Sequence, residues 1–288
     1  MRLVIVTDLD GTLLDPVTYE FGPALEALHR VERTGIPLVV CSSKTRAEIE
    51  AIQRRLGIAH PFISENGGAI VAPPGYFVAR APASVDGGGR FVLELGRPYR
   101  EIVAILREVA AAEHVRVIGF SDMTVSGVAL DCGLSVFDAQ LAKLRQYDEP
   151  FRFVDSDPAA RSRFLRALRR RGVKLISGGR YEHATGDSDK GRAVTALRDL
   201  YAEWEGTVTL AGLGDGLNDV SMLRVVDIPF IVRSDMHGAT GRLLRKVPTA
   251  RVTQASGPAG WAEAVTAVLD GARPAGFRLR AASWLGRG

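Results

Sequence analysis

Near its start the chain reads Leu3-Val4-Ile5-Val6-Thr7-Asp8-Leu9-Asp10-Gly11-Thr12, an apolar run that ends in two aspartates. The apolar part is typical of a buried β-strand, and the glycine opens the backbone where that strand ends. Because alternate side chains of an extended segment point to the same side, Asp8 and Asp10 can converge on one point. Two carboxylates about 3–5 Å apart repel each other unless a cation or a proton is present. This stretch alone leaves two interpretations open, a chemical site and a structural cap with a turn.

Strand-like apolar runs alternate with amphipathic helical stretches at both ends of the chain. In the first 60 residues these segments are Leu3–Thr7, Pro23–Arg33, Ile36–Cys41 and Thr45–Leu56. Toward the C-terminus they are Ala193–Ala202, Val208–Leu213, Asp219–Val225, Ile228–Val232 and Trp261–Leu269. A βαβα order is typical of a parallel sheet. Both ends therefore predict one α/β core built on a doubly wound, Rossmann-like parallel sheet.

The middle of the chain has a different pattern, which predicts an inserted domain. Strand-like segments at Ala69–Val78 and Arg90–Leu95 flank the turn-rich segment Ala83–Gly89. Beyond them, the helical stretches Tyr99–Ala112 and Pro158–Arg171 alternate with strand-like Val115–Gly119 and Phe151–Val154. We therefore expect residues 1–80 and 187–288 to form the core, and residues 81–186 to form an inserted α+β cap that selects the substrate.

A second acidic cluster, Gly212-Leu213-Gly214-Asp215-Gly216-Leu217-Asn218-Asp219, also follows an apolar strand. Ligand sites of doubly wound sheets lie at the carboxyl ends of strands, so Asp215 and Asp219 are placed near the first pair. Four carboxylates form an oxygen-rich site of the kind that Mg²⁺ prefers. A dinucleotide-binding loop is the alternative, but Leu217 stands where the third glycine of that motif belongs, and four acids would repel a pyrophosphate. The cluster therefore favours a magnesium site made by Asp8, Asp10, Asp215 and Asp219.

Two further polar residues lie next to predicted strands and helices of the core. Ser42 follows the strand Ile36–Cys41 and offers a hydroxyl to a phosphate oxygen, and Lys190 begins the helix before the Asp215 strand. A lone serine or lysine is usually without a special role. Because Ser42 and Lys190 occur in this order between the two acidic clusters, both residues become candidates for binding a phosphoryl group.

The composition excludes several classes of protein. An apolar content of 46%, a charged content of 24% and no apolar stretch near 18 residues indicate a globular chain rather than a membrane or disordered one. The first apolar run stops at Asp8, too soon for a signal peptide, so we expect a cytoplasmic location. Net charge is +4, but the basic residues are scattered and lack interleaved aromatics, so a small anionic substrate is favoured over nucleic acid. Cys41 and Cys132 are too isolated for a zinc site or a disulfide framework.

Taken together, the order DLDGT, a strand-end serine, a lysine before a helix and GDGLND resembles the haloacid dehalogenase superfamily of phosphohydrolases over the whole chain. The insertion and the run Ser64-Glu65-Asn66-Gly67-Gly68 are similar to members with a type IIB cap, most of which act on sugar phosphates. Cys41-Ser42-Ser43-Lys44-Thr45 resembles the mannosyl-3-phosphoglycerate phosphatase branch, as does Gly178-Gly179-Arg180 followed by His183.

This resemblance implies roles for individual residues. Asp8 is the implied nucleophile, which forms an aspartyl phosphate, and Asp10 is the implied general acid and base. Asp8, the backbone carbonyl of Asp10, and Asp215 would hold Mg²⁺, with Asp219 in or just behind that shell. Ser42 and Lys190 would bind the phosphoryl oxygens, Gly11 would let the backbone bend around the metal, and Ser43 and Lys44 are candidate neighbours of the phosphate. Arg180 and His183 are candidates for contacting the organic part of a phosphorylated glycosyl glycerate.

Three alternatives remain open at this point. A general sugar phosphatase, including one similar to sucrose-phosphate phosphatases, has the same core motifs with another cap specificity. A phosphotransferase that resembles the phosphomannomutases would return the phosphate to a sugar rather than to water. A non-enzymatic magnesium-binding module is disfavoured because both Asp8 and Asp10 are present.

Overall fold

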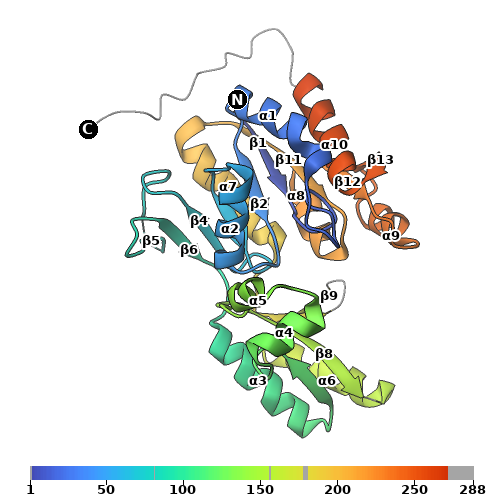
Figure 1. Cartoon of the computed structure of the whole chain (residues 1–288). Helices are drawn as coiled ribbons and strands as arrows, with labels where there is room; N and C mark the ends of the chain where they lie inside the picture. Colours follow the sequence, from blue (N-terminus) through green and yellow to red (C-terminus); the bar gives the residue numbers. More distant parts are fainter. Residues whose placement is uncertain (1, 81, 156, 178–180, 272–288) are drawn as a thin grey trace.

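A computed structural model describes residues 2–80, 82–155, 157–177 and 181–271. It has two parts, each with its own sheet, drawn one above the other in Figure 1. The larger sheet contains nine strands in the order β13-β12-β11-β1-β2-β3-β4-β6-β5. The smaller sheet contains four strands in the order β7-β8-β10-β9.

The larger sheet is parallel from β13 to β3 and antiparallel from β3 to β5, which confirms the predicted doubly wound core. Its strands are β1 (Arg2–Thr7), β2 (Leu38–Cys41), β3 (Phe62–Ser64), β4 (Ala69–Ala72), β5 (Ser84–Val85), β6 (Phe91–Glu94), β11 (Val208–Gly214), β12 (Ile228–Arg233) and β13 (Arg251–Ser256). β1 lies between β2 and β11, so its carboxyl end is at the middle of the parallel part. Strands that are covered on both faces form continuous apolar runs, and Val4, Ile5 and Val6 are fully buried.

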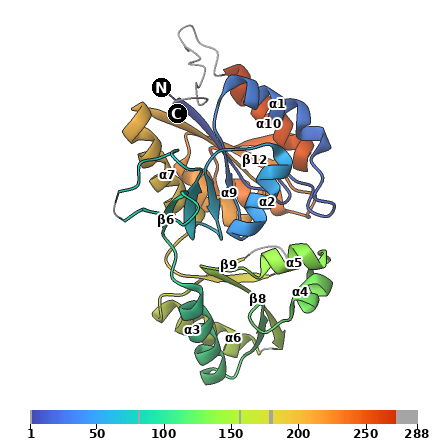
Figure 2. The same ribbon diagram turned by 60° about the vertical axis from the view of Figure 1, so that its left-hand side comes forward.

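Helices cover both faces of this sheet, as Figures 1 and 2 show. They are η1 (Gly22–Ala24), α1 (Leu25–Thr34), α2 (Arg46–Leu56), α7 (Lys190–Glu205), η2 (Leu217–Asp219), α8 (Val220–Val225), α9 (Ala239–Lys246) and α10 (Gly257–Gly271). Leu3 and Ile5 pack in one apolar cluster with residues of α1, α2 and α10. Val4 and Val6 pack in a second cluster with residues of α7, α8 and α9. The alternation of side chains along β1 thus joins two layers of helices to one sheet.

The smaller part contains α3 (Tyr99–Ala112), β7 (Arg116–Gly119), α4 (Val125–Cys132), α5 (Val136–Ala142), β8 (Asp148–Asp155), α6 (Pro158–Arg170), β9 (Lys174–Ser177) and β10 (Glu182–Thr185). Ile102, Leu106, Phe151, Phe164 and Leu168 belong to its own apolar cluster, which joins α3 and α6 to the sheet. In Figure 2, α3 and α6 lie on the side away from the core, whereas β9 and α5 lie toward it. α5 contacts α2, and β9 contacts η2.

β5 and β6 lie within the segment predicted as the cap, but they belong to the larger sheet, where β6 pairs with β4 and β5 pairs with β6. The hairpin of β4 and β6 therefore extends the core, and Pro73-Pro74-Gly75 ends β4 earlier than the sequence pattern indicated. We propose that the cap begins near Gly96 rather than at residue 81. The predicted return to the core at residue 187, just before α7, stays a prediction.

No single helix among the described residues is long and apolar enough to cross a membrane. The helices α4 and α5 reach such a length and apolar content only when they are counted together, and they are bent by 106° relative to each other. The cytoplasmic location stays a prediction.

Candidate active site

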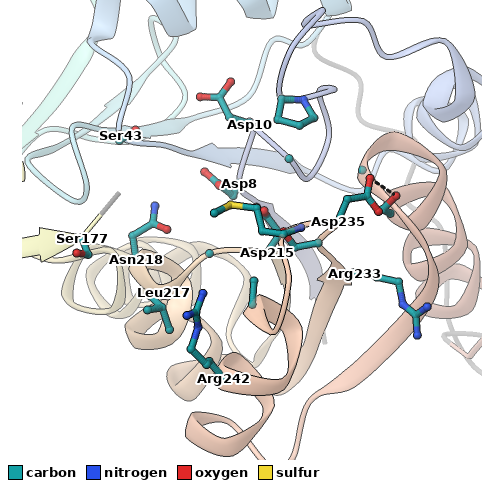
Figure 3. Close-up of a pocket in the computed structure, with 18 of the residues that line it drawn as sticks. Asp8, Asp10, Ser43, Ser177, Asp215, Leu217, Asn218, Arg233, Asp235 and Arg242 are labelled. Carbon is teal, nitrogen blue, oxygen red and sulfur yellow. Dashed lines mark hydrogen bonds between the residues drawn. The ribbon is translucent and has the colours of Figure 1, made fainter. Parts of the chain in front are cut away.

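The two acidic motifs meet because their strands are neighbours. β1 and β11 pair in parallel with Thr7 opposite Leu213, and the Asp8 N–H donates to the Leu213 carbonyl at 2.9 Å. Carboxylate oxygens of Asp8, Asp215 and Asp219 consequently lie within 4.8 Å of one another. Figure 3 shows Asp8 and Asp215 at the centre of the site. The predicted convergence of carboxylates is thus present in the structure for these three aspartates.

Lys190 is the cation that accompanies this cluster. Its Nζ donates to Asp8 Oδ1 at 2.8 Å and to Asp219 Oδ1 at 2.6 Å, and its side chain is fully buried. Asp189 caps α7 by accepting from the Arg192 N–H, which fixes the first turn from which Lys190 extends. Burial alone would lower the pKa of Lys190, but Asp219 and Asp8 outweigh it and hold that pKa above its ordinary value. Lys190 is therefore a permanent ammonium in this site.

One lysine does not neutralise three carboxylates. Burial, and then the negative charge of Asp219, raise the pKa of Asp8 to about 7 in spite of Lys190. Burial, Asp219 and Asp8 also raise the pKa of Asp215 well above its ordinary value. Desolvated like charges favour protonation unless a cation joins them. A divalent cation fits this site, because three carboxylate oxygens close to one point are hard ligands, and one lysine does not balance their negative charge.

Local contacts fix the position of Asp215. The Thr12 hydroxyl donates to Asp215 Oδ1 at 2.9 Å. Gly11 has a φ of +78°, and a Cβ at this position would lie 2.5 Å from Asp215 Oδ2. Only glycine meets both demands, the left-handed backbone and the close approach to a carboxylate. The glycine and threonine that follow Asp10 therefore serve the second acidic motif, which is 204 residues away from Gly11 in the sequence.

Asp10 lies beside the cluster rather than in it. One of its oxygens, Oδ2, is 2.9 Å from Lys44 Nζ, and the other, Oδ1, is buried without a hydrogen-bond partner among the described residues. Lys44 also lies over the Tyr19 ring, 4.8 Å from its centroid. Burial would lower the pKa of Lys44, but Asp10 and Glu48 raise it above its ordinary value. The role of Asp10 as general acid and base stays a prediction, and its Oδ1 is available for contact with a bound molecule.

Ser42 and Ser43 have different surroundings. Ser42 is buried, and its hydroxyl accepts from the Lys44 N–H at 3.3 Å. Ser43 lines the cavity above the cluster, and its carbonyl accepts from Arg145 of the cap at 2.8 Å. The role of either serine in binding phosphate stays a prediction.

A cavity of about 690 Å³ lies between the core and the cap. Asp8, Asp10 and Asp215 form its floor, and Cys132, Ser177, Tyr181 and His183 reach it from the cap. On the core side it is lined by Arg233, at the end of β12, and by Arg242, in α9. The cavity is large enough to hold an organic group as well as a phosphate.

Some of these residues were absent from the sequence-based prediction. Arg233 and Arg242 are exposed arginines outside any motif, so nothing in the sequence distinguished them from the other arginines. The predicted substrate contact Arg180 lies outside the described residues. His183 lines the cavity as an expected contact would, and the contact itself stays a prediction.

Comparisons with known proteins found similar sequences and a similar structure. A family model of haloacid dehalogenase-like hydrolases matches residues 5–86. Over 266 residues the chain is 40% identical to a glucosyl-3-phosphoglycerate/mannosyl-3-phosphoglycerate phosphatase of Methanococcoides burtonii, covering 92% of this chain and 96% of that protein. A protein of the same name from Persephonella marina is 41% identical over 235 residues, 80% and 84% of the two chains. The crystal structure of a haloacid dehalogenase-like hydrolase from Bacteroides thetaiotaomicron shares the fold, with a TM-score of 0.63 at 19% identity over 93% of this chain and 99% of that one.

Proposed function

This chain belongs to the haloacid dehalogenase-like hydrolases, and on that premise we propose that it is a Mg²⁺-dependent phosphatase of glycosyl-3-phosphoglycerates. The observation that supports the chemistry best is the cluster of Asp8, Asp215 and Asp219 around the ammonium of Lys190. The names of the relatives that match most of the chain support the choice of substrate.

The first step of the proposed mechanism is attack by an Asp8 oxygen on the phosphorus. The bond from phosphorus to the organic oxygen breaks, and Asp10 gives its proton to that leaving oxygen. Lys190 stabilises the negative charge on the phosphoryl oxygens from the buried side of the site. A Mg²⁺ ion held by Asp8 and Asp215, with Asp219 beside them, would supply further positive charge where two anions must meet.

The second step releases phosphate and restores the enzyme. Asp10 takes a proton from a water molecule, whose oxygen attacks the phosphorus of the aspartyl phosphate. The bond between phosphorus and the Asp8 oxygen then breaks, which gives inorganic phosphate and a free carboxylate. The buried, unpartnered oxygen of Asp10 supports this role, since it can accept the proton without losing another contact.

The organic part of the substrate would occupy the cavity between core and cap. A glycerate carboxylate needs a cation, and the described part of the cavity offers Arg233 and Arg242 on the core side. Arg180, predicted from sequence for the same carboxylate, is an alternative partner. Sugar hydroxyls would meet polar residues of the cap, such as Ser177 and His183.

The test is a comparison of substrates with the purified full chain and Mg²⁺. Mannosyl- and glucosyl-3-phosphoglycerate are expected to release phosphate with a higher kcat/KM than mannose 6-phosphate, glucose 6-phosphate or sucrose 6-phosphate. Equal cleavage of the simple sugar phosphates would reduce the proposal to a general sugar phosphatase. A requirement for a bisphosphate activator, with the phosphate returned to sugar, would favour a phosphomutase instead.

A further inference from the structure

The loop between β3 and β4 joins the core to the cap in an unusual backbone conformation. Glu65 and Asn66 have positive φ angles of 47° and 56°, which non-glycine residues rarely adopt, and both side chains are fully buried. Residues in such conformations persist where the surrounding contacts fix them. Here the contacts come from the start of β8 in the cap.

Three consecutive residues of the cap, Gln146, Tyr147 and Asp148, form hydrogen bonds with these two side chains. The Glu65 carboxylate accepts from the N–H groups of Gln146, at 3.0 Å, and Tyr147, at 2.8 Å. The Asn66 amide nitrogen donates to Asp148 Oδ2 at 2.8 Å. Residues 146–148, which lead into β8, are therefore attached to the loop between β3 and β4 of the core.

Asp148 links this attachment to the cavity. Both of its oxygens lie 2.9 Å from His183 Nδ1, and its side chain is fully buried. Arg145 Nη1 is 4.0 Å from Asp148 Oδ2 and 2.8 Å from the Ser43 carbonyl. Burial alone would raise the pKa of Asp148, but His183, Arg145 and Asn66 hold it below its ordinary value. Asp148 is therefore an ionised carboxylate, which can only accept hydrogen bonds.

We propose that Asp148 is a positioning residue that holds the proton of His183 on Nδ1 and turns the Nε2 lone pair toward a hydroxyl group of the substrate. Whenever the imidazole of His183 is neutral it carries one N–H, and the ionised carboxylate beside Nδ1 accepts that N–H. Nε2 then has only a lone pair, and His183 lines the cavity. The second part, the hydroxyl contact, rests on the proposed function.

The hydrogen bond from Asn66 also fixes where Asp148 and His183 lie relative to the core. Asp148 and His183 belong to the cap, but Asn66 holds Asp148 to the loop that follows β3 of the core. The imidazole is thus held at a fixed position relative to the proposed phosphate site, although β10 itself pairs only with strands of the cap sheet. Asp148 carries no recognisable motif, and its role follows from these contacts alone.

The first experiment needs no substrate. In the full chain labelled with ¹⁵N-histidine, at a pH high enough for the imidazoles to be neutral, the nitrogen spectrum is expected to show His183 as the Nδ1–H tautomer. The chain has five histidines, and the signal missing from His183→Gln identifies this one. Asp148→Ala is expected to shift His183 toward the Nε2–H tautomer that is usual for free imidazole. An Nε2–H tautomer in the unaltered protein would overturn the proposal even if Asp148→Ala does not fold.

Glu149→Ala is the matched control. Glu149 is the next residue on β8 and is also buried, but it accepts from Tyr99 and Ser121 within the cap. Its removal is expected to leave the His183 tautomer unchanged. A shift as large as that in Asp148→Ala would indicate a general disturbance of β8 and would contradict a specific role for Asp148.

Kinetics test the hydroxyl contact. Asp148→Ala and His183→Ala are each expected to raise KM for mannosyl-3-phosphoglycerate about ten-fold, the scale of one hydrogen bond. The double variant should be no worse than either single one. The loss in kcat/KM should be at least about five-fold larger than with p-nitrophenyl phosphate, which has no aliphatic hydroxyl. Equal losses with both esters would overturn the contact. No cleavage of the glycosyl ester by the unaltered enzyme would contradict the proposed function, while the tautomer would still test the positioning.

Discussion

The floor and the cap wall of the cavity differ in how their polar groups are held. The floor and the charged groups directly beneath it comprise Asp8 and Asp215, which follow the parallel strands β1 and β11, and the buried Lys190 and Asp219, which lie within a few ångströms of them. The wall consists of four side chains from separate elements or loops of the cap, Cys132, Ser177, Tyr181 and His183. The charged groups of the floor depend on one another, whereas the wall residues are held by contacts within the cap, such as Tyr181 with Cys132 and His183 with Asp148. Changes in the floor should therefore abolish the chemistry, and changes around the wall should alter the selection of substrate.

The largest expected effect is that of Asp8→Asn. The amide has the same shape but is neither a nucleophile nor a good metal ligand, so turnover should fall by roughly 10⁴-fold or more. Folding should be retained, because a neutral group beside Asp215 and Asp219 relieves repulsion. Phosphate release and thermal melting measure the two effects. Near-normal turnover in this variant would contradict the proposed nucleophile.

Removal of the metal should have a comparable effect on activity and a smaller one on stability. Chelation is expected to abolish turnover, and Mg²⁺ should restore it. At a Mg²⁺ concentration about 100 times its Kd, the ion should add about 2.7 kcal/mol to the free energy of unfolding. Asp215→Asn should lose most of this stabilisation, whereas Glu149→Gln, far from the floor, should keep it. Full activity in excess chelator would exclude a metal-dependent floor.

The pH dependence of stability should separate the two regions further. The pKa of Asp8 is about 7 in the folded protein, above its ordinary value of 3.8, so the folded state binds its proton more tightly than the unfolded one. Without metal, the contribution of Asp8 should thus be most favourable below pH 4 and should be lost as pH rises to 7, by at most about 4 kcal/mol.

Denaturant unfolding in chelator at several pH values measures this contribution as the difference between the unaltered protein and Asp8→Asn. The variant should gain in relative stability between pH 4 and pH 7. A constant difference in the free energy of unfolding across that range would show that folding does not raise the pKa of Asp8. Ser177→Ala, a change in the wall at a side chain that does not titrate in this range, should not reproduce the trend.

The smallest expected effect concerns the arginine that binds the glycerate carboxylate. If Arg242 of the core makes this contact, Arg242→Ala should raise KM for mannosyl-3-phosphoglycerate about 10- to 100-fold with little change in kcat. If Arg180 makes it, Arg180→Ala should do so instead. Sugar phosphates that lack a carboxylate should respond little to either change. Steady-state kinetics of both variants with both kinds of ester decide between core and cap.

The sequence by itself determined most of the chemistry. Asp8 and Asp215 are 207 positions apart, but both follow apolar runs. Parallel strands present their carboxyl ends at one edge, so adjacency followed from the pattern once the strands were assigned. The glycine after Asp10 and the lysine that begins α7 could be placed in the same way. Short motifs at strand ends are local signals, and the fold class fixes where they lie.

Only the tertiary structure decided what surrounds the organic part of a substrate. The apolar pattern did not predict α4 and α5, and Arg233, Arg242 and Asp148 carry no motif. The place of Asp148 depends on a contact between segments far apart in the chain, its hydrogen bond with Asn66. Ordinary residue types acquire such roles by packing, which no local periodicity records. The limits of the core have the same origin, because β6 joins the larger sheet by pairing with β4, and β5 by pairing with β6, and such pairing depends on register rather than composition.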